Sequence, residues 1–199
     1  MVVSIKQMHK NFSLLCKEIR VLPRQILVNR TEQTLTMRQE GDITDTMILE
    51  PNERQILEYR RGKSRSLRFK LPNTQPSSPI QIDNLGTVNF YVLSNELDSK
   101  VFIKLDTQIV DGFVMMVVSL QAPEEIPYLI RNRTKEIVVE VPILDEKVGP
   151  SRMIAFSWRD PEMNHNLEVR LHHEGNTVTK FVEINPDRVG MKKRVEFPQ

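Results

Sequence analysis

Apolar and polar residues alternate one by one along much of the chain. Leu35 and Met37 alternate with Thr34, Thr36 and Arg38. The same period recurs at residues 66–71, 101–105, 137–141, 154–158 and 167–171. Successive side chains of a β-strand point to opposite faces, so this period predicts strands with one face on a core. The sequence therefore predicts an all-β fold.

Turn-forming residues separate the alternating segments. Gly, Asp and Asn occur at residues 40–42, 84–86, 111–112 and 174–176, where they favour tight turns. The best helical candidate, residues 52–61 after Pro51, aligns with the alternating residues 153–158 of the second half. We therefore predict strands at both places. Many short strands joined by such turns are typical of β-sandwiches.

One segment of the chain occurs twice. The string Pro-Arg-Gln-Ile-Leu-Val-Asn-Arg-Thr at residues 23–31 is matched by Pro-Tyr-Leu-Ile-Arg-Asn-Arg-Thr at residues 127–134, so that Asn132 follows Asn29 by 103 residues. Further landmarks recur in the same order at offsets of 99 to 104 residues: 49–52 with 148–151, 56–59 with 155–158, 67–70 with 167–170, and Gly86 with Gly190. Chance rarely produces so many matches in one order. The sequence predicts two tandem antiparallel β-sandwich repeats.

The boundary between the two repeats is expected near Asp111 and Gly112. The first repeat then covers residues 1–110 and the second covers residues 111–199, with residues 113–120 in the role that residues 12–21 have before the first Asn-Arg-Thr. The second repeat has no counterpart of residues 101–109. Either the chain ends before the last strand of this repeat, or another segment supplies that strand. Residues 1–8 are the nearest candidate.

Charge and cysteine content narrow the function classes. Lys and Arg number 28 against 26 Asp and Glu, a net charge of +2, so no global field attracts nucleic acid or an anionic membrane. Cys16 is the only cysteine and lies in an apolar run, where a thiol behaves as a small buried hydrophobe. No apolar stretch approaches the roughly 18 residues of a membrane span, and the first ten residues do not resemble a signal peptide. We expect a cytoplasmic location.

No motif for catalysis is present. The sequence has no nucleotide-binding loop, zinc-protease helix or nucleophile elbow, which predicts no enzyme, no cofactor and no metal site. His172 and His173 are neighbours on a predicted strand and cannot share one metal; we expect one to be exposed and the other packed. The basic segments 60–65 and 192–194 could meet lipid head groups, but short charge runs are usually solvated loops.

Asn29 and Asn132 each begin an Asn-Arg-Thr sequence that fits the N-glycosylation pattern, as Asn11 does with Ser13. The alternative is that each carboxamide binds turn backbone at the end of its strand, where Asn also tolerates a left-handed conformation. Recurrence at one structural position favours this structural role. Trp158, with Tyr59 at the matching position of the first repeat, is expected to anchor the core.

The sequence resembles the adaptor-binding repeats of the vacuolar protein sorting-associated protein thirteen family, which are bridge-like lipid-transfer proteins. The resemblance rests on residues 23–31 and 127–134, on Ser-Trp-Arg-Asp-Pro at residues 157–161, and on the all-β period of about a hundred residues. It implies that Asn29 and Asn132 are the characteristic Asn of each repeat. The first repeat departs from the Trp pattern with Tyr-Arg-Arg-Gly at residues 59–62.

The resemblance further implies an adaptor-binding role. Such repeats recognise short proline-containing motifs of organelle adaptors, and so target a longer parent chain to contact sites of membranes such as endosome, vacuole or mitochondrion. The membrane is reached only through adaptors, and nucleic acid is no partner. An extended peptide can add to an exposed strand edge, for which residues 126–130 and 137–141 are candidates. The expected partner-binding residues are Ile126, Tyr128, Ile130, Ile137, Val139 and Val141.

Two other function classes fit a tandem of β-sandwiches. One is an extracellular adhesion pair, against which the single Cys16 argues; Asp111 alone does not make the calcium site that such a pair would use. The other is a glycan-binding sandwich, which would need two carboxylates in a cleft. Asp83 with Asp106, or Asp145 with Glu146, are the pairs available, and their spacing does not distinguish them from surface charge.

Overall fold

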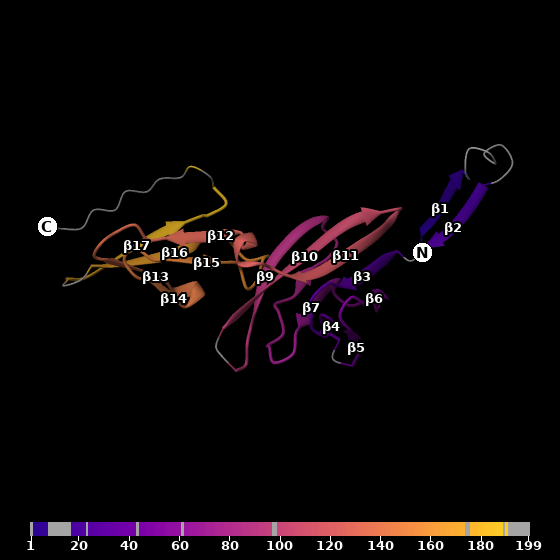
Figure 1. Cartoon of the computed structure of the whole chain (residues 1–199), viewed down its shortest axis with the longest axis horizontal. Coiled ribbons are helices and arrows are strands. Elements are labelled where there is room, and N and C mark those ends of the chain that lie inside the picture. The colour runs from indigo at the N-terminus through magenta and orange to yellow at the C-terminus, as the bar shows by residue number, and fades with distance from the viewer. Residues whose placement is uncertain are drawn as a thin grey trace. The chain divides into compact units, whose positions relative to one another are not determined.

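The computed structural model describes residues 2–7, 17–22, 24–42, 44–60, 62–96, 99–173, 176–188 and 190. In this part of the chain all regular elements are β-strands, apart from two short 3₁₀ turns (Figure 1). The all-β prediction is therefore confirmed. The chain divides into two compact units, Met1–Gln121 and Ala122–Gln199.

The first unit contains a hairpin and two larger sheets. Strands β1 (Val2–Gln7) and β2 (Lys17–Leu22) form the antiparallel hairpin. A five-stranded sheet has the order β6-β3-β11-β10-β9, formed by β6 (Arg54–Ile56), β3 (Gln25–Asn29), β11 (Phe113–Leu120), β10 (Lys100–Val110) and β9 (Gly86–Leu93). A four-stranded sheet has the order β5-β4-β7-β8, formed by β5 (Thr46–Leu49), β4 (Leu35–Gln39), β7 (Ser66–Lys70) and β8 (Ile80–Gln81).

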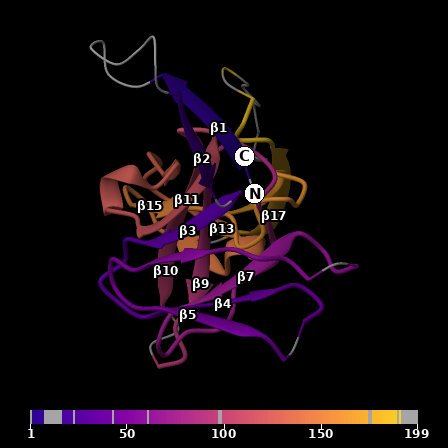
Figure 2. The same cartoon turned by 90° about the vertical axis from the view of Figure 1, so that its right-hand side faces the viewer.

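The two larger sheets of the first unit pack face to face (Figure 2). Their inward side chains form one core, in which Phe69 of β7 meets Phe90 of β9 with ring centroids 5.9 Å apart. The period of two explains this arrangement, because Leu35, Met37 and Phe69 are buried while the residues between them face outward.

Strand β11 belongs to the first sandwich. It pairs antiparallel with β10 and parallel with β3, the one parallel pair among the described strands. Met116 and Val118 of this strand are fully buried in the first core. The compact units meet at residues 121 and 122, so the boundary expected between residues 110 and 111 falls inside the β10–β11 hairpin. The boundary lies later than expected because β11 pairs with both β3 and β10 and so belongs to the first unit.

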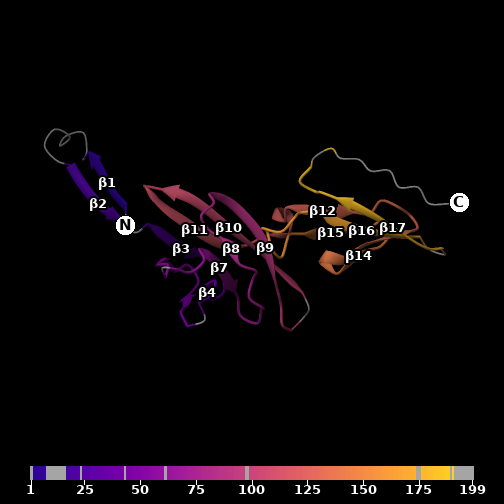
Figure 3. The same ribbon diagram turned by 180° about the vertical axis from the view of Figure 1, so that it is seen from behind.

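The second unit repeats part of this plan (Figure 3). One sheet pairs β12 (Tyr128–Arg131) with β15 (Met153–Phe156), and the other has the order β14-β13-β16-β17. The second sheet is formed by β14 (Glu146–Val148), β13 (Ile137–Val141), β16 (Leu167–His173) and β17 (Asn176–Ile184), and the 3₁₀ turns are η1 (Pro123–Glu125) and η2 (Pro142–Leu144). A smaller core forms around Phe156, Trp158 and Leu167.

The strand registers match between the two units. Val28 is paired with Arg54 in the first unit, and Arg131 is paired with Met153 in the second. These are the positions that the sequence duplication aligns. The order β5-β4-β7-β8 likewise returns as β14-β13-β16-β17. The tandem of two related sandwiches is therefore confirmed.

The second unit differs at one edge. Strand β3 has β6 on one side and β11 on the other, whereas β12 has only β15 within the described residues. The expectation that residues 1–8 supply a strand to the second repeat is not met by Val2–Gln7, which pairs with Lys17–Leu22 instead. Cys16 and residues 8–16 lie outside the described part of the chain.

The Met116→Ala substitution tests the membership of β11. We expect it to destabilise the first sandwich by about 2–5 kcal/mol, the usual cost of a large-to-small change in a core. Hydrogen exchange measured for each unit should show faster exchange in β3 and β10 and unchanged protection in β13 and β16. The control is Met153→Ala, because Met153 is 60% exposed. Loss of protection in the second unit instead would contradict the assignment.

Candidate functional site

The Asn29 side chain joins the end of β3 to the turns of the other sheet. Its Nδ2 donates to the carbonyl oxygens of Gln33 at 2.8 Å, Leu49 at 3.0 Å and Glu50 at 3.2 Å. Its Oδ1 accepts from the backbone N–H of Thr31 at 2.9 Å and from the Thr31 hydroxyl at 2.7 Å. Asn29 is fully buried. Every polar atom of the carboxamide therefore has partners inside the protein.

The Asn132 side chain makes the same contacts in the second unit. Its Nδ2 donates to the carbonyl oxygens of Ile137 at 2.7 Å, Val148 at 2.9 Å and Gly149 at 3.0 Å. Its Oδ1 accepts from the N–H of Thr134 at 3.0 Å and from the Thr134 hydroxyl at 2.7 Å. In both units the Thr of Asn-Arg-Thr therefore donates to the Asn side chain. A sugar-acceptor sequence does not require such a contact.

Neither Asn29 nor Asn132 is in the left-handed conformation that the sequence argument considered for them. The left-handed residues nearby are Asn52, with φ of 64°, and Ser151, with φ of 57°. These two occupy equivalent turns of the two units. The backbone reversal and the side-chain contacts are therefore divided between two residues. Asn11 lies outside the described residues.

Strand β12 carries two of the expected partner-binding residues, and a third lies just before it. Tyr128 and Ile130 are half-buried and pack against the second core, while Ile126 precedes the strand. The outward positions are exposed apolar residues that the sequence argument did not select: Leu129 is 54% exposed and Met153 of β15 is 60% exposed. The sequence could have revealed these two residues, because each is an apolar residue at an outward position of an alternating strand.

Strand β13 is not an edge strand, so the second candidate edge was wrong. Its residues pair with β14 on one side, from Val139 to Val141, and with β16 on the other, from Ile137 to Glu140. Val141 is fully buried. The backbone groups that a peptide would need are therefore largely used by neighbouring strands. Of the two candidates, only residues 126–130 adjoin an edge without a neighbour in the described residues.

The core of the second unit contains an aromatic cluster around Trp158. Trp158 is almost fully buried and stacks on His165, with ring centroids 4.8 Å apart. The Tyr128 hydroxyl donates to Asp187 at 2.6 Å, and His165 Nδ1 lies 2.7 Å from the same carboxylate. The hydrogen bonds from Tyr128 and then from His165 lower the pKa of Asp187 below its ordinary value of 3.8. Trp158 therefore anchors the core, as expected.

The two adjacent histidines lie against carboxylates. His172 Nε2 lies 2.6 Å from Glu140, and His173 Nε2 lies 3.2 Å from Glu136. Both side chains are partly exposed, 40% and 32%, so the expectation of one exposed and one packed histidine was wrong. Within the described residues no group of three His, Cys, Asp or Glu side chains could hold a metal ion.

The first basic segment is occupied by contacts within the protein. Arg60 binds Asp42 at 3.0 Å, and Arg65 binds Asp83 at 3.3 Å. Lys63 donates to the carbonyl of Gly41 at 2.8 Å. These contacts favour the solvated-loop interpretation. Residues 192–194 lie outside the described part, in which no helix is long and apolar enough to cross a membrane.

The carboxylates considered for glycan chemistry have other surroundings. Asp83 binds Arg65, and Asp106 accepts from the Thr87 hydroxyl at 3.0 Å. Asp145 is the left-handed residue that ends the turn η2, with φ of 53°. Asp111 is the left-handed first residue of the β10–β11 turn, with φ of 50°. These contacts and turn conformations account for the acidic residues at these four positions.

The Asn132→Ser substitution should destabilise the second unit by at least about 3 kcal/mol, because each buried polar group left unpaired costs about 1–3 kcal/mol. Urea unfolding followed by Trp158 fluorescence measures this, since Trp158 lies in the second core. Asn166→Ser is the matched control, because Asn166 makes an exposed bond to Glu183 at 2.8 Å. Equal effects of the two substitutions would contradict the structural role.

The Asp187→Asn substitution should reveal a pH-dependent contribution to stability. The pKa of Asp187 is lowered in the folded state, so its stabilisation is present above the ordinary value and is lost as pH falls through the folded value. The free energies of unfolding of wild type and variant should therefore differ at neutral pH and converge below about pH 4. Tyr128→Phe, which removes the hydroxyl donor, should weaken the same pH dependence. A difference independent of pH would argue against it.

A comparison with protein families finds a match that covers most of the chain. The family model of the adaptor binding domain of vacuolar-sorting associated protein 13 matches residues 1–181. No curated protein sequence matches the chain. The matched range includes both Asn-Arg-Thr sequences and every described strand up to β16, and it ends within β17. The chain therefore belongs to the family of vacuolar-sorting associated protein 13 adaptor binding domains.

Proposed function

We propose that the chain recognises short proline-containing motifs of organelle adaptor proteins by taking them up as an added strand on β12. In this way it would target a bridge-like lipid-transfer protein to membrane contact sites. The observation that carries the proposal is the difference between β3 and β12. β3 is covered by β11, whereas β12 has β15 alone among the described residues.

The backbone groups of β12 that would bind a peptide follow from β3. On β3, the N–H of Arg30 donates to Val118 at 2.7 Å and the carbonyl of Arg24 accepts from Val114 at 2.9 Å. Every second residue of β3 therefore faces β11. The equivalent residues on the side of β12 away from β15 are Pro127, Leu129, Arg131 and Arg133. The N–H of Asn132 faces β15 instead, donating to Arg152 at 2.9 Å.

An added strand is compatible with proline in the ligand. Only every second residue of an edge peptide turns its N–H toward the sheet, so a proline at an alternate position forfeits no hydrogen bond. The exposed Leu129 and Met153 supply apolar contact on the outer face, and pockets for alternate side chains give specificity in this mode of binding. A proline-containing extended segment therefore suits β12.

The proposed role implies a cytoplasmic position at contact sites, with the membrane reached only through the adaptor. Organelles such as endosome, vacuole or mitochondrion would be selected by which adaptor presents the motif. The match to an adaptor binding domain supports a binding role without catalysis. No specific observation favours adhesion or glycan binding.

The Leu129→Pro substitution tests strand addition on β12. Leu129 directs its N–H away from β15, so proline should block the added strand while leaving the β12–β15 pairing intact. Binding of proline-containing peptides, taken from cytosolic segments of organelle membrane proteins and measured by fluorescence anisotropy, should weaken at least about tenfold. This corresponds to about 1.4 kcal/mol, the scale of a lost hydrogen bond.

Leu129→Val is the matched control, because it keeps the N–H and a branched apolar side chain. It should retain peptide affinity within about threefold, and both variants should keep the wild-type melting temperature within a few degrees. Undiminished peptide binding by Leu129→Pro, with the fold intact, would refute strand addition on β12.

A further inference from the structure

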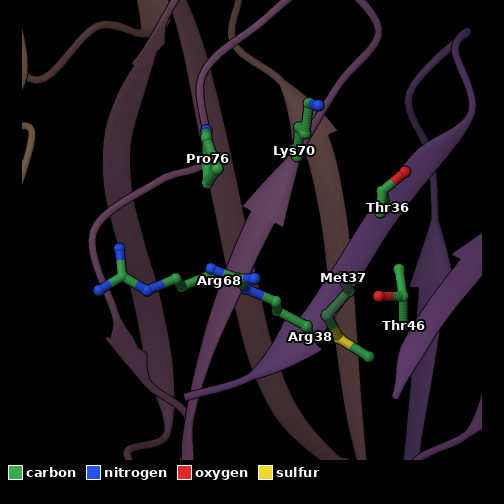
Figure 4. Close-up of a pocket in the computed structure, with 7 residues that line it drawn as sticks. All are labelled: Thr36, Met37, Arg38, Thr46, Arg68, Lys70 and Pro76. Carbon is green, nitrogen blue, oxygen red and sulfur yellow. The ribbon is translucent and has the colours of Figure 1, made fainter. Parts of the chain in front are cut away.

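A cavity of about 210 Å³ lies on the outer face of the β5-β4-β7 sheet in the first unit. It is lined by Thr36, Met37, Arg38, Thr46, Arg68, Lys70 and Pro76 (Figure 4). Three of these side chains are cations, and two carry hydroxyl groups. None of them belongs to the Asn29 network or to β12, so the cavity shares no residue with the proposed adaptor site.

The strand register explains why these side chains meet. Arg38 of β4 is paired with Arg68 of β7, and Thr36 is paired with Lys70. On the other side of β4, Arg38 is paired with Thr46 of β5. Directly paired residues have Cβ atoms about 4.5–5.5 Å apart. Since Met37 and Phe69 face the core, the polar residues between them project together from the outer face.

The charges of this cation cluster, Arg38, Arg68 and Lys70, are only partly balanced. Arg68 is held by a bidentate pair with Glu40 and donates to the carbonyl of Ser77 at 3.0 Å. The hydrogen bond from Arg68 lowers the pKa of Glu40, which therefore remains ionised. The charge of Arg38 also lowers the pKa of Glu40, but within the described residues neither Arg38 nor Lys70 makes a side-chain hydrogen bond or ion pair. Like charges directly opposite each other destabilise a sheet, so an anion would relieve the cluster.

The second unit carries the opposite charge on the equivalent face. Thr36 pairs with Lys70 in the first unit, and Glu140 pairs with Arg170 at the matching positions of the second. Glu168 stands where the first unit has Arg68, and it accepts from Arg170 at 2.9 Å. The second unit therefore neutralises its cation internally. The unbalanced cluster is a property of the first unit and not of the module.

We propose that the cation cluster binds a phosphate monoester on a side chain of a partner protein. Three cations offset by Glu40 leave two positive charges, and a phosphorylated side chain carries about −1.5 to −2 charges. The guanidinium of Arg38 and the ammonium of Lys70 supply charge-assisted hydrogen bonds. The hydroxyls of Thr36 and Thr46 supply further donors. This site goes beyond the proposed function, because it needs neither β12 nor a proline motif.

The size and charge of the cavity favour a side chain over a membrane. Pockets for drug-sized ligands measure about 300–1,000 Å³, so a cavity of about 210 Å³ suits a single group. Basic surfaces that bind anionic lipids usually carry about four to eight Lys and Arg residues, and only three line this cavity. The Arg68 guanidinium already binds Glu40 and the Ser77 carbonyl, so Arg38 and Lys70 are the cations that would bind the phosphate.

The test is titration of the full chain with N-acetyl-O-phosphoserine amide, followed by NMR. We expect saturable shifts of amides in β4 and β7 and no such shifts with N-acetyl-serine amide. The Arg38→Gln/Lys70→Gln double variant should bind at least about tenfold more weakly, because it loses two charge-assisted hydrogen bonds. Lys70→Gln alone, at an exposed position, provides the same readout if the double variant is unfolded.

The matched control is Arg54→Gln, which removes an exposed cation from β6 of the same unit. It should leave the affinity within about twofold, since general electrostatic attraction by one surface charge is weak and screened. Equal weakening in the control, or no saturable shifts in β4 and β7, would overturn the proposal. Binding only to phosphatidylcholine vesicles that contain a phosphoinositide, with no response to the phosphoserine compound, would also overturn it and would assign the cluster to a lipid head group.

Discussion

The architecture of both units depends on one buried carboxamide. In the first unit Asn29 ends a strand of one sheet and donates to the carbonyl of Leu49 at the end of a strand in the other sheet. The Asn side chain thereby links the two sheets of the sandwich at a place where no backbone hydrogen bonds between the described strands connect them. An apolar side chain there would leave buried carbonyl groups without donors, at about 1–3 kcal/mol each. This cost explains why the same residue with the same partners stands in the second unit at Asn132.

The two units share this Asn contact but differ in which strand pairs with the strand that ends at or next to the Asn, β3 in the first unit and β12 in the second. β11 covers β3, and its buried Met116 and Val118 extend the first core. β12 has no such neighbour among the described strands, and an edge of this kind leaves backbone N–H and C=O groups unpaired. Charged residues at an edge discourage uncontrolled pairing, and Arg131 and Arg133 are both exposed there. In the proposed mode of binding, these charges would protect the edge against unspecific association.

The sequence predicted what depends on local pattern and missed what depends on pairing. Alternation identified β4, β7 and β13, because burial of one face is visible within five residues. It did not reveal that β13 is flanked by β14 and β16, since the period of two says which face is buried and not which strands are neighbours. The position of β11 was missed for the same reason: its parallel partner β3 lies almost ninety residues earlier. The two-repeat organisation was predicted correctly because the matching segments recur in one order at a nearly constant offset along the chain.

The cation cluster shows how a duplicated module acquires new chemistry. Inward positions are constrained by the core and the Asn joint by its buried carbonyls, so both units retain them. Outward positions of the β4–β7 and β13–β16 pairs carry no such constraint, and one unit has Arg38, Arg68 and Lys70 where the other balances Glu140 and Glu168 against Arg170. A surplus of like charge lowers the stability of a sheet. A bound anion would offset this cost, and for this reason the proposed phosphate site rests on the imbalance and not on the number of cations alone.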